Sequence, residues 1–313
     1  MNARYCLALI LIVSLAGCGS AQKTTVATAP ITGSLERQNF LYPFERGTGL
    51  SIDQFGNIYA ISMGRNTLAK FTHTGDSLAG VSGTGSDHYQ FNGLFDVDAR
   101  LSTAIFIADS RNHRIEQYTK DLAYVSTLQT RDNPDAAKRF GYPVAVAVDD
   151  AGNIYVADAE NKRVLKVRSD YTVERVIGGF TDATRPEAIV TRPARLAVDQ
   201  TERLFVLDDA DNSVVEYDNL GNFIARRSLG PIPSATDMLP TRRLLTSNDT
   251  VFVFSPTEVA LLRAPALDPI GRWTIVGTDD RRWVPTDMAM RNGIIYLLTP
   301  EGLSRYAVRS PGP

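Results

Sequence analysis

Histidine is the residue type that most sharply limits the chemistry open to this chain. The 313 residues include three histidines, His73, His88 and His113. A catalytic zinc site needs three protein ligands that converge on one ion. We expect His73 on a turn at the opposite end of its unit from the other two, His113 in a structural position, and His88 in a long loop. A three-histidine site is therefore not expected, and no metal, cofactor or catalytic residue is predicted.

Aspartate recurs at one place in a repeated phrase. Asp53, Asp98, Asp149 and Asp199 each end a short apolar segment before a turn. They form either a functional ring of carboxylates or a set of turn caps, in which each carboxylate accepts hydrogen bonds from the turn backbone. Their place before Gly-Asn hairpins favours the caps. The pairs Asp109/Arg114 and Asp158/Arg163 are interpreted as contacts that fix loops.

Asp96 does not fit the turn-cap explanation. It stands where the equivalent apolar segments have Ala147 and Ala197. A lone carboxylate is costly to bury, so Asp96 is expected to line a solvated channel or to be hydrogen-bonded. We therefore include it among the candidate ligand-binding residues.

The connections between the repeated units are the main binding candidates. They run over about 82–93, 129–143, 178–193, 229–240 and 277–285. Long loops on a rigid scaffold are where binding usually lies, and exposed aromatic and arginine residues are typical of interface hot spots. The alternative is a merely solvated surface. The candidates in these loops are Asp87, His88, Tyr89, Arg131, Arg139, Arg185, Arg281, Arg282 and Trp283.

The elements that position these residues come from an internal repeat. The recurring aspartates are spaced by 45, 51 and 50 residues, and two degenerate copies follow, near 242–254 and 287–298. The sequence of each unit predicts four short strands. An apolar strand and a Gly-containing turn come first, followed by a β-branched and aromatic strand such as 105–108, an alternating strand and a more polar outer strand. Units of this length and content are typical of propeller blades.

The repeat resembles the NHL-repeat family of β-propellers. The resemblance rests on Val148-Asp149-Asp150-Ala151-Gly152-Asn153-Ile154-Tyr155-Val156-Ala157-Asp158 and on the following Asn161-Lys162-Arg163. Ser62 replaces the loop Asp in the first unit, and Val214 stands in place of the Arg in the fourth. The resemblance implies an all-β, six-bladed propeller with four-stranded blades. The resemblance also implies that catalysis is possible, because the family includes a zinc-dependent amidating lyase and lyases of cyclic antibiotics.

Ring closure is predicted from the two ends of the repeat region. The sixth unit supplies three strands and ends near Tyr306, whereas one extra strand is predicted around 35–41. Propellers often close when an N-terminal strand completes the last blade, which removes two sheet edges. We therefore expect the N-terminal strand to close the ring.

The first twenty residues differ from the rest. Arg4 precedes an apolar run from Leu7 to Leu15 that is too short to span a membrane and resembles a secretory signal. Leu15-Ala16-Gly17-Cys18 resembles a bacterial lipobox, in which the cysteine carries the lipid; the alternative is an ordinary signal peptide with a chance cysteine. The predicted domains are a signal peptide over 1–17, lipidated Cys18 with a flexible tether over 18–34, and the propeller over 35–313.

Residues after the lipobox and the overall charge bear on location and partners. Gly19 and Ser20, rather than Asp, follow Cys18. By analogy with Gram-negative sorting, this favours the outer membrane of the cell envelope, facing either side. Without residues 1–17 the 33 basic residues become 32 against 35 acidic ones, a net charge of −3. Such a chain is not expected to bind nucleic acid, and with Cys6 removed no disulfide is possible.

Two function classes follow from these observations. In the first, a lipid-anchored monomer uses its propeller as a binding or scaffold module for a protein, peptide or glycan partner on the loop face. In the second, the propeller is a lyase or lactonase that acts at the mouth of the central channel. The small number of histidines and the lack of CxxC, GxSxG and phosphate-binding glycine motifs favour the first class.

Overall fold

Strands account for nearly all of the regular structure. The computed structural model describes residues 29–101, 103–180, 185–230, 243–276 and 285–310. Within these ranges the chain forms 24 strands, β1 to β24, and three short 3-10 helices, η2 (Ser110–Asn112), η3 (Ala136–Lys138) and η4 (Pro186–Ala188). The prediction of an all-β fold is confirmed.

Four sheets have the four-stranded, antiparallel form that the repeat predicts, with strands paired in chain order. The first two contain β2 (Gly49–Ile52), β3 (Ile58–Ser62), β4 (Thr67–Phe71) and β5 (Ser77–Ser82), then β6 (Leu94–Asp98), β7 (Ala104–Asp109), β8 (Arg114–Thr119) and β9 (Tyr124–Leu128). The next two contain β10 (Pro143–Val148), β11 (Ile154–Asp158), β12 (Arg163–Val167) and β13 (Val173–Ile177), then β14 (Pro193–Val198), β15 (Leu204–Asp208), β16 (Ser213–Tyr217) and β17 (Phe223–Ser228).

The remaining strands form one eight-stranded sheet. Its order is β18-β19-β20-β21-β1-β24-β23-β22. It contains β18 (Arg243–Ser247), β19 (Thr250–Phe254), β20 (Glu258–Arg263), β21 (Asp268–Ile275), β1 (Ile31–Tyr42), β24 (Gly302–Arg309), β23 (Ile294–Thr299) and β22 (Asp287–Arg291). This sheet consists of two four-stranded groups, β18–β21 and β22–β24 with β1, that meet where β1 pairs with β21.

Strand β1 joins the two ends of the described chain. It pairs antiparallel with β24 from Ser34 to Tyr42 and parallel with β21 from Ile31 to Leu35. The predicted closing strand near the N-terminus is therefore present. The structure corrects its boundary, because residues 31–34, assigned to the tether, already belong to β1. Only Ile31 and Thr32 of this run are β-branched and Gly33 and Ser34 follow them, so the local strand signal is weak. Backbone pairing to β21 and β24 sets the place of the run.

The apolar core lies between neighbouring groups of strands rather than at one centre. Six clusters of buried side chains each join two successive groups. One of them, with Leu35, Phe254 and Met288, lies between the two halves of the eight-stranded sheet. Because both faces of each group are covered, second strands such as β7 are buried at every residue. The outer strand β5 alternates between exposed and half-buried residues.

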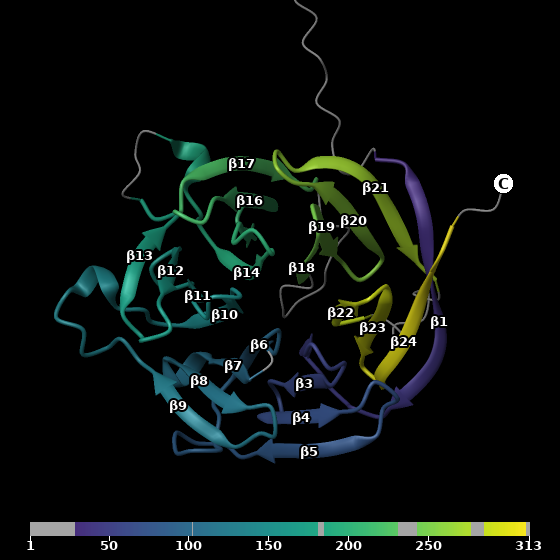
Figure 1. The fold of residues 1–313 in the computed structure, drawn as a ribbon, viewed down its shortest axis with the longest axis horizontal. Helices are drawn as coiled ribbons and strands as arrows, with labels where there is room; N and C mark the ends of the chain where they lie inside the picture. The colour runs from purple at the N-terminus through teal and green to yellow at the C-terminus, as the bar shows by residue number, and fades with distance from the viewer. Residues whose placement is uncertain (1–28, 102, 181–184, 231–242, 277–284, 311–313) are drawn as a thin grey trace, which may run out of the picture.

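Figure 1 shows these groups arranged in a ring, with β6, β10, β14, β18 and β22 nearest the centre and β5, β9, β13, β17 and β21 around the rim. Antiparallel order gives the ring two faces. The hairpin face has the turns between first and second strands and between third and fourth strands. The loop face has the connections from second to third strands and from one group to the next. Strand β1 runs parallel to β21, so Ile31 lies at the hairpin face and Tyr42 at the loop face.

Candidate functional site

The central channel is lined by the first strand of each group, which we call the inner strands: β2, β6, β10, β14, β18 and β22. Each has one edge paired with its own second strand, and its other edge faces the channel. Backbone N–H and C=O groups on that free edge need partners when they are buried. Charged side chains from other groups supply many of them.

Arg243 of β18 binds across the whole channel. Its guanidinium donates a hydrogen bond to the carboxylate of Asp96 in β6 and lies 3.6 Å from that of Asp287 in β22. It also donates to the carbonyls of Leu50, at 3.2 Å, and Val97, at 3.3 Å. Burial by itself would lower the pKa of Arg243, but Asp287 and Asp96 together raise it above its ordinary value. Arg243 is therefore a buried, permanently charged link.

The carboxylates of this cluster satisfy the opposite type of backbone group. Asp287 accepts the N–H of Leu50 at 2.8 Å, and Asp96 accepts the N–H of Val146 at 3.1 Å. Burial raises the pKa of Asp287, while the nearby Arg243 opposes that shift. The side chains of Arg243, Asp96 and Asp287 thus bind both one another and the inner strands.

Arg100, just after β6, extends the same arrangement to the rest of the ring. Its guanidinium donates to the carbonyls of Val148 in β10 and Val198 in β14. Between them, Arg100 and Arg243 connect the inner strands β2, β6, β10, β14, β18 and β22. The sequence predicted Asp96 to be hydrogen-bonded or channel-lining, and this is confirmed; its role in ligand binding stays a prediction.

The arginine links were missed by sequence reasoning. The signal that identified Asp96, a charged residue in a strand expected to be apolar, also marks Arg195, Arg243 and Asp287. The degenerate repeat phrase hides this signal at Arg243 and Asp287, whereas Arg195 stands in the fourth unit, just before Asp199.

A cavity of about 650 Å³ occupies the channel on the hairpin side. Residues at the end of the inner strand in every group line it, among them Gln54, Arg100, Asp150, Gln200, Asn248 and Asn292. Its inner wall includes Leu50, Leu196 and Arg243. The channel thus offers an open, partly apolar space next to fixed positive charge.

The recurring aspartates were all predicted to cap turns, and this is confirmed for Asp53, Asp149 and Asp199. Asp53 accepts the N–H groups of Phe55 and Asn57 at 2.9 and 2.8 Å, and Asp199 accepts the two equivalent N–H groups of its own turn. Asp149 accepts the N–H of Asn153 at 2.8 Å. Asp98 differs. It accepts the N–H of Arg100 and also that of Val148 in the neighbouring group. Its second carboxylate oxygen thus binds the neighbouring inner strand β10 instead of its own turn.

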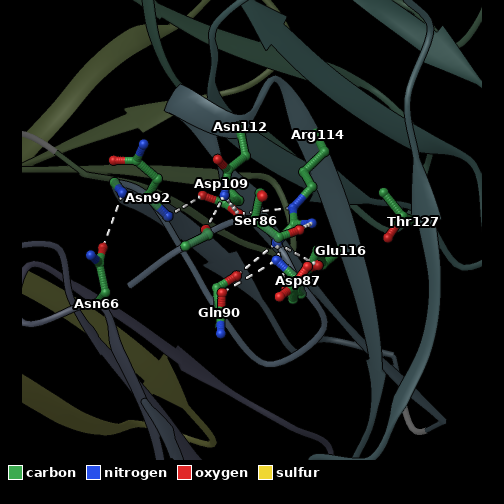
Figure 2. Close-up of polar contacts among 12 residues, drawn as sticks. Asn66, Ser86, Asp87, Gln90, Asn92, Asp109, Asn112, Arg114, Glu116 and Thr127 are labelled. Carbon is green, nitrogen blue, oxygen red and sulfur yellow. Dashed lines mark hydrogen bonds and ion pairs between the residues drawn. The ribbon is translucent and has the colours of Figure 1, made fainter. Parts of the chain in front are cut away.

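On the loop face, Arg114 fixes the connection over 82–93, as Figure 2 shows. Its guanidinium donates to the Asp109 carboxylate at 2.9 Å and to the carbonyls of Ser86 and Gln90, both at 2.6 Å. Glu116 lies 2.9 Å away on the other side. Asp109 in turn accepts the N–H of Asn92 at 2.8 Å. The predicted loop-fixing role of the Asp109/Arg114 pair is confirmed.

The next two groups use equivalent contacts. Arg163 lies 3.2 Å from Asp158 and donates to the Arg139 carbonyl at 2.6 Å. In the following group the structure corrects the sequence alignment, because Ser213, not Val214, pairs with Asp208 at the arginine position. Arg226 of β17 replaces the missing arginine from another strand, at 2.6 Å from Asp208. It also donates to the Ile189 carbonyl at 2.7 Å.

The structure brings three candidate residues together at β9. The ring centroids of His88 and Tyr124 are 4.0 Å apart, and the Tyr89 hydroxyl accepts the N–H of Tyr124 at 3.1 Å. The carbonyl of Asp87 accepts a hydrogen bond from Arg114. His88 and Tyr89 are both exposed at the surface.

The other candidates are spread over the loop face. Arg131, Arg139 and Arg185 are exposed, and the Arg139 guanidinium donates to the carbonyl of Asn133 at 2.6 Å. Arg281, Arg282 and Trp283 lie outside the described residues, as does Cys18.

The histidines at 73 and 113 have structural contacts. His113 has a left-handed backbone, and its Nδ1 lies 3.1 Å from the Gly141 carbonyl oxygen. The His73 carbonyl accepts the Tyr296 hydroxyl, at the turn end opposite the loop face. In the part of the chain that the structure describes, no three His, Cys, Asp or Glu side chains are grouped as metal ligands. In the same residues, no helix has the length and apolar character that a membrane span requires.

Comparisons with known proteins agree with this architecture. The NHL repeat model matches residues 140–167, and no curated protein sequence matches the chain. Among solved structures, a streptogramin B lyase is 12% identical, with a TM-score of 0.57 over 89% of this chain and 98% of the other. The virginiamycin B lyase of Staphylococcus aureus is 12% identical, with a TM-score of 0.54 over 89% and 90% of the two chains.

A chain of a nidogen/laminin complex is similar as well. It is 14% identical, with a TM-score of 0.55 over 73% of this chain and 80% of the other. At these identities the likeness concerns the fold alone. The chain is a β-propeller that carries an NHL repeat.

Proposed function

We propose that this protein is a six-bladed, membrane-anchored bacterial lipoprotein whose propeller binds a protein, peptide or glycan partner on its loop face. The blade count is supported by the six apolar clusters, which together connect every four-stranded group to the next. In this proposal the eight-stranded sheet represents two blades that share β1. The anchor is the lipid on Cys18, in the outer membrane of the cell envelope.

One observation carries the binding role: three successive inter-blade connections each present an exposed aromatic side chain. Tyr89 is 44% exposed, Tyr142 44% and Phe180 61%. Exposed rings are typical interface anchors because they offer large contact areas with little loss of conformational entropy.

The positions of these rings are preset by contacts already described. Arg114 fixes the connection that contains Tyr89, because it binds the carbonyls of Ser86 and Gln90 on either side of it. Gly141, next to Tyr142, donates its N–H to Asp158 at 3.1 Å. The Lys162 ammonium lies 5.8 Å from the centroid of the Phe180 ring. A partner therefore binds a surface that is largely ordered in advance, which reduces the entropic cost of binding.

The direction of the anchor supports the same surface. The tether joins β1 at the hairpin face, because β1 begins there and ends at the loop face. A propeller held at that end presents its loop face away from the membrane. Arg131, Arg139 and Arg185 belong to this face, and we include Arg281, Arg282 and Trp283 in the proposed surface.

The alternative function is a lyase or lactonase at the channel mouth, and the 650 Å³ cavity favours it. Two of the similar structures are lyases, but at 12% identity they support a shared fold only. We prefer binding because the carboxylates of Asp96 and Asp287 in the channel already bind Arg243 and inner-strand N–H groups, whereas the rings of the loop face remain exposed.

The test compares partner capture by the full chain and by two variants, purified from native membranes with the anchor intact. In the first variant Tyr89, Tyr142 and Phe180 are replaced by Ala. The matched control is Phe55→Ala, which removes a ring that is 62% exposed on the hairpin face. We expect the triple variant to lose a partner that the control retains, with unchanged melting in both. Equal recovery by both variants would contradict the proposal.

The anchor is tested separately by Cys18→Ser. We expect this variant to leave the membrane fraction, because a multiply acylated N-terminus is the proposed attachment. A variant that stays in the membrane fraction after a high-salt wash would contradict lipid anchoring, whatever the result of partner capture.

A further inference from the structure

The cavity on the hairpin side has the features of a ligand site that is distinct from the loop face. Its walls combine apolar side chains, among them Leu50, Ile52 and Leu196, with three guanidinium groups. Arg100 contributes from the end of β6, Arg243 from β18, and Arg291 from β22. Binding sites for small molecules typically combine an apolar lining with a few fixed polar groups.

Two of these guanidinium groups have unused donors. The Nε atoms of Arg100 and Arg243 are both buried, and neither has a hydrogen-bond partner among the described residues. Arg243 itself is 7% exposed. A buried donor without an acceptor is costly, and more so on a charged group. An acceptor brought by a ligand would remove that cost.

The acidic residues of the lining are largely engaged elsewhere. Asp98 accepts the N–H groups of Arg100 and Val148, and burial raises its pKa. Asp199 is 2.7 Å from Arg203. Asp150 is mostly exposed, at 4.0 Å from Arg100. Asp96 and Asp287 offset the charge of Arg243 through its Nη1 atom. A negatively charged group is therefore favoured near Arg291 and near the Nε atoms of Arg100 and Arg243, where the described residues place no acceptor.

We propose that this cavity binds a small oxyanion, a carboxylate or phosphate group on a compact body, between Arg100, Arg243 and Arg291. Guanidinium groups bind both kinds of oxyanion through paired N–H donors. The apolar inner-strand side chains contact the body of the ligand. Because the cavity opens at the hairpin face, its occupant and a loop-face partner bind independently.

The test is isothermal titration calorimetry of the full chain in non-ionic detergent, with inorganic phosphate and glutarate as probes and chloride at equal ionic strength as a control. The deciding variant is Arg291→Gln, which removes a cavity guanidinium without a described structural contact. Its matched control is Arg263→Gln at the exposed end of β20, outside the cavity lining. We expect Arg291→Gln to weaken binding by ~10-fold or more, the usual effect of losing a charged hydrogen bond.

Each outcome decides the proposal. Binding of phosphate alone identifies a phosphate group, binding of glutarate alone a carboxylate, and binding of both a general oxyanion site. Absence of binding by both probes at millimolar concentration overturns the proposal. Equal weakening by Arg263→Gln, or no weakening by Arg291→Gln, overturns it as well. Arg100→Gln is a second probe of the same site where circular dichroism shows that it folds.

Discussion

In the channel and on the loop face, arginine side chains donate hydrogen bonds to backbone carbonyls. The channel arginine connects different groups of strands, whereas the loop-face arginine connects one strand pair with its own loop. Arg243 connects Asp96, Asp287 and two carbonyls that belong to three other groups of strands. Arg114 binds its own strand pair and the connection leading into it. Loss of the first should loosen the whole ring, whereas loss of the second should loosen one loop. Charge in the channel therefore stabilises the fold, and charge on the loop face positions exposed side chains.

The largest effect is expected from deletion of β1. Removing residues 18–28 should leave the melting temperature unchanged, because this deletion keeps Ala29 and Pro30, whose carbonyls accept hydrogen bonds from Arg272. Removing residues 18–42 exposes the edges of β21 and β24 and removes Leu35 from its apolar cluster, so the cooperative thermal transition should be lost. Calorimetry on both deletions checks this. Identical transitions would show that the ring is held closed by other contacts.

Arg243→Met should have the largest effect of any single change in the channel. It leaves Asp96 and Asp287 buried without their cation, which costs ~3–5 kcal/mol in unfolding free energy. Urea denaturation measures the cost, and hydrogen exchange should show faster exchange at the amides of Leu50 and Val146. Arg263→Met is the exposed control. A cost below ~1 kcal/mol would remove the distinction between the two regions.

Glu216 tests how a buried carboxylate behaves when its cation is farther away than Arg114 is from Glu116. Its carboxylate lies 3.7 Å from Arg203, and burial raises its pKa to about 7. The folded state therefore keeps a proton that the unfolded state releases above its lower pKa, so stability falls as pH rises from about 4.5 to about 7. Glu216→Gln should match wild type near pH 4 and exceed it at pH 8 by up to ~3 kcal/mol.

The control for this pH effect is Glu174→Gln, whose side chain is 34% exposed. Urea denaturation at several pH values measures both variants. A wild-type stability that does not fall between pH 4.5 and pH 7, or an equal gain in both variants, would contradict the assignment to Glu216.

Arg114→Met should have the smallest effect on global stability, ~2 kcal/mol, because both carboxylates beside it keep other donors. Asp109 keeps its bonds from Asn92 and Asn112, and Glu116 keeps its bond from the Tyr118 hydroxyl. Hydrogen exchange should be faster at the amides of Phe91 and Asn92 but unchanged at the channel amides. Partner affinity should fall together with the order of the loop. Faster exchange throughout the ring would show that the loop face, too, supports the whole fold.

Much of the fold was predictable because each unit carries its own local signals. Alternating and β-branched runs predicted the strands of the first four groups, and the aspartates before Gly-Asn turns predicted caps such as Asp53 and Asp149. The Asp109/Arg114 pair was predictable for the same reason, since its members are five residues apart. Prediction from local sequence failed where the same contact is made from another strand. In the fourth group Ser213 stands at the arginine position, and Arg226 of β17 binds Asp208 instead.

The sequence alone thus determined the repeat, the strand pattern, the turn caps and the presence of a closing strand. Tertiary structure alone decided which charged residues meet in the channel. Arg243 and Asp96 are separated by 147 residues, and Arg243 and Leu50 by 193. No local periodicity records such a pair, because the partners are chosen by ring closure, which brings every inner strand to one axis. The same closure extended β1 to Ile31, where backbone pairing with β21 orders a short run that the local sequence pattern did not separate from the tether.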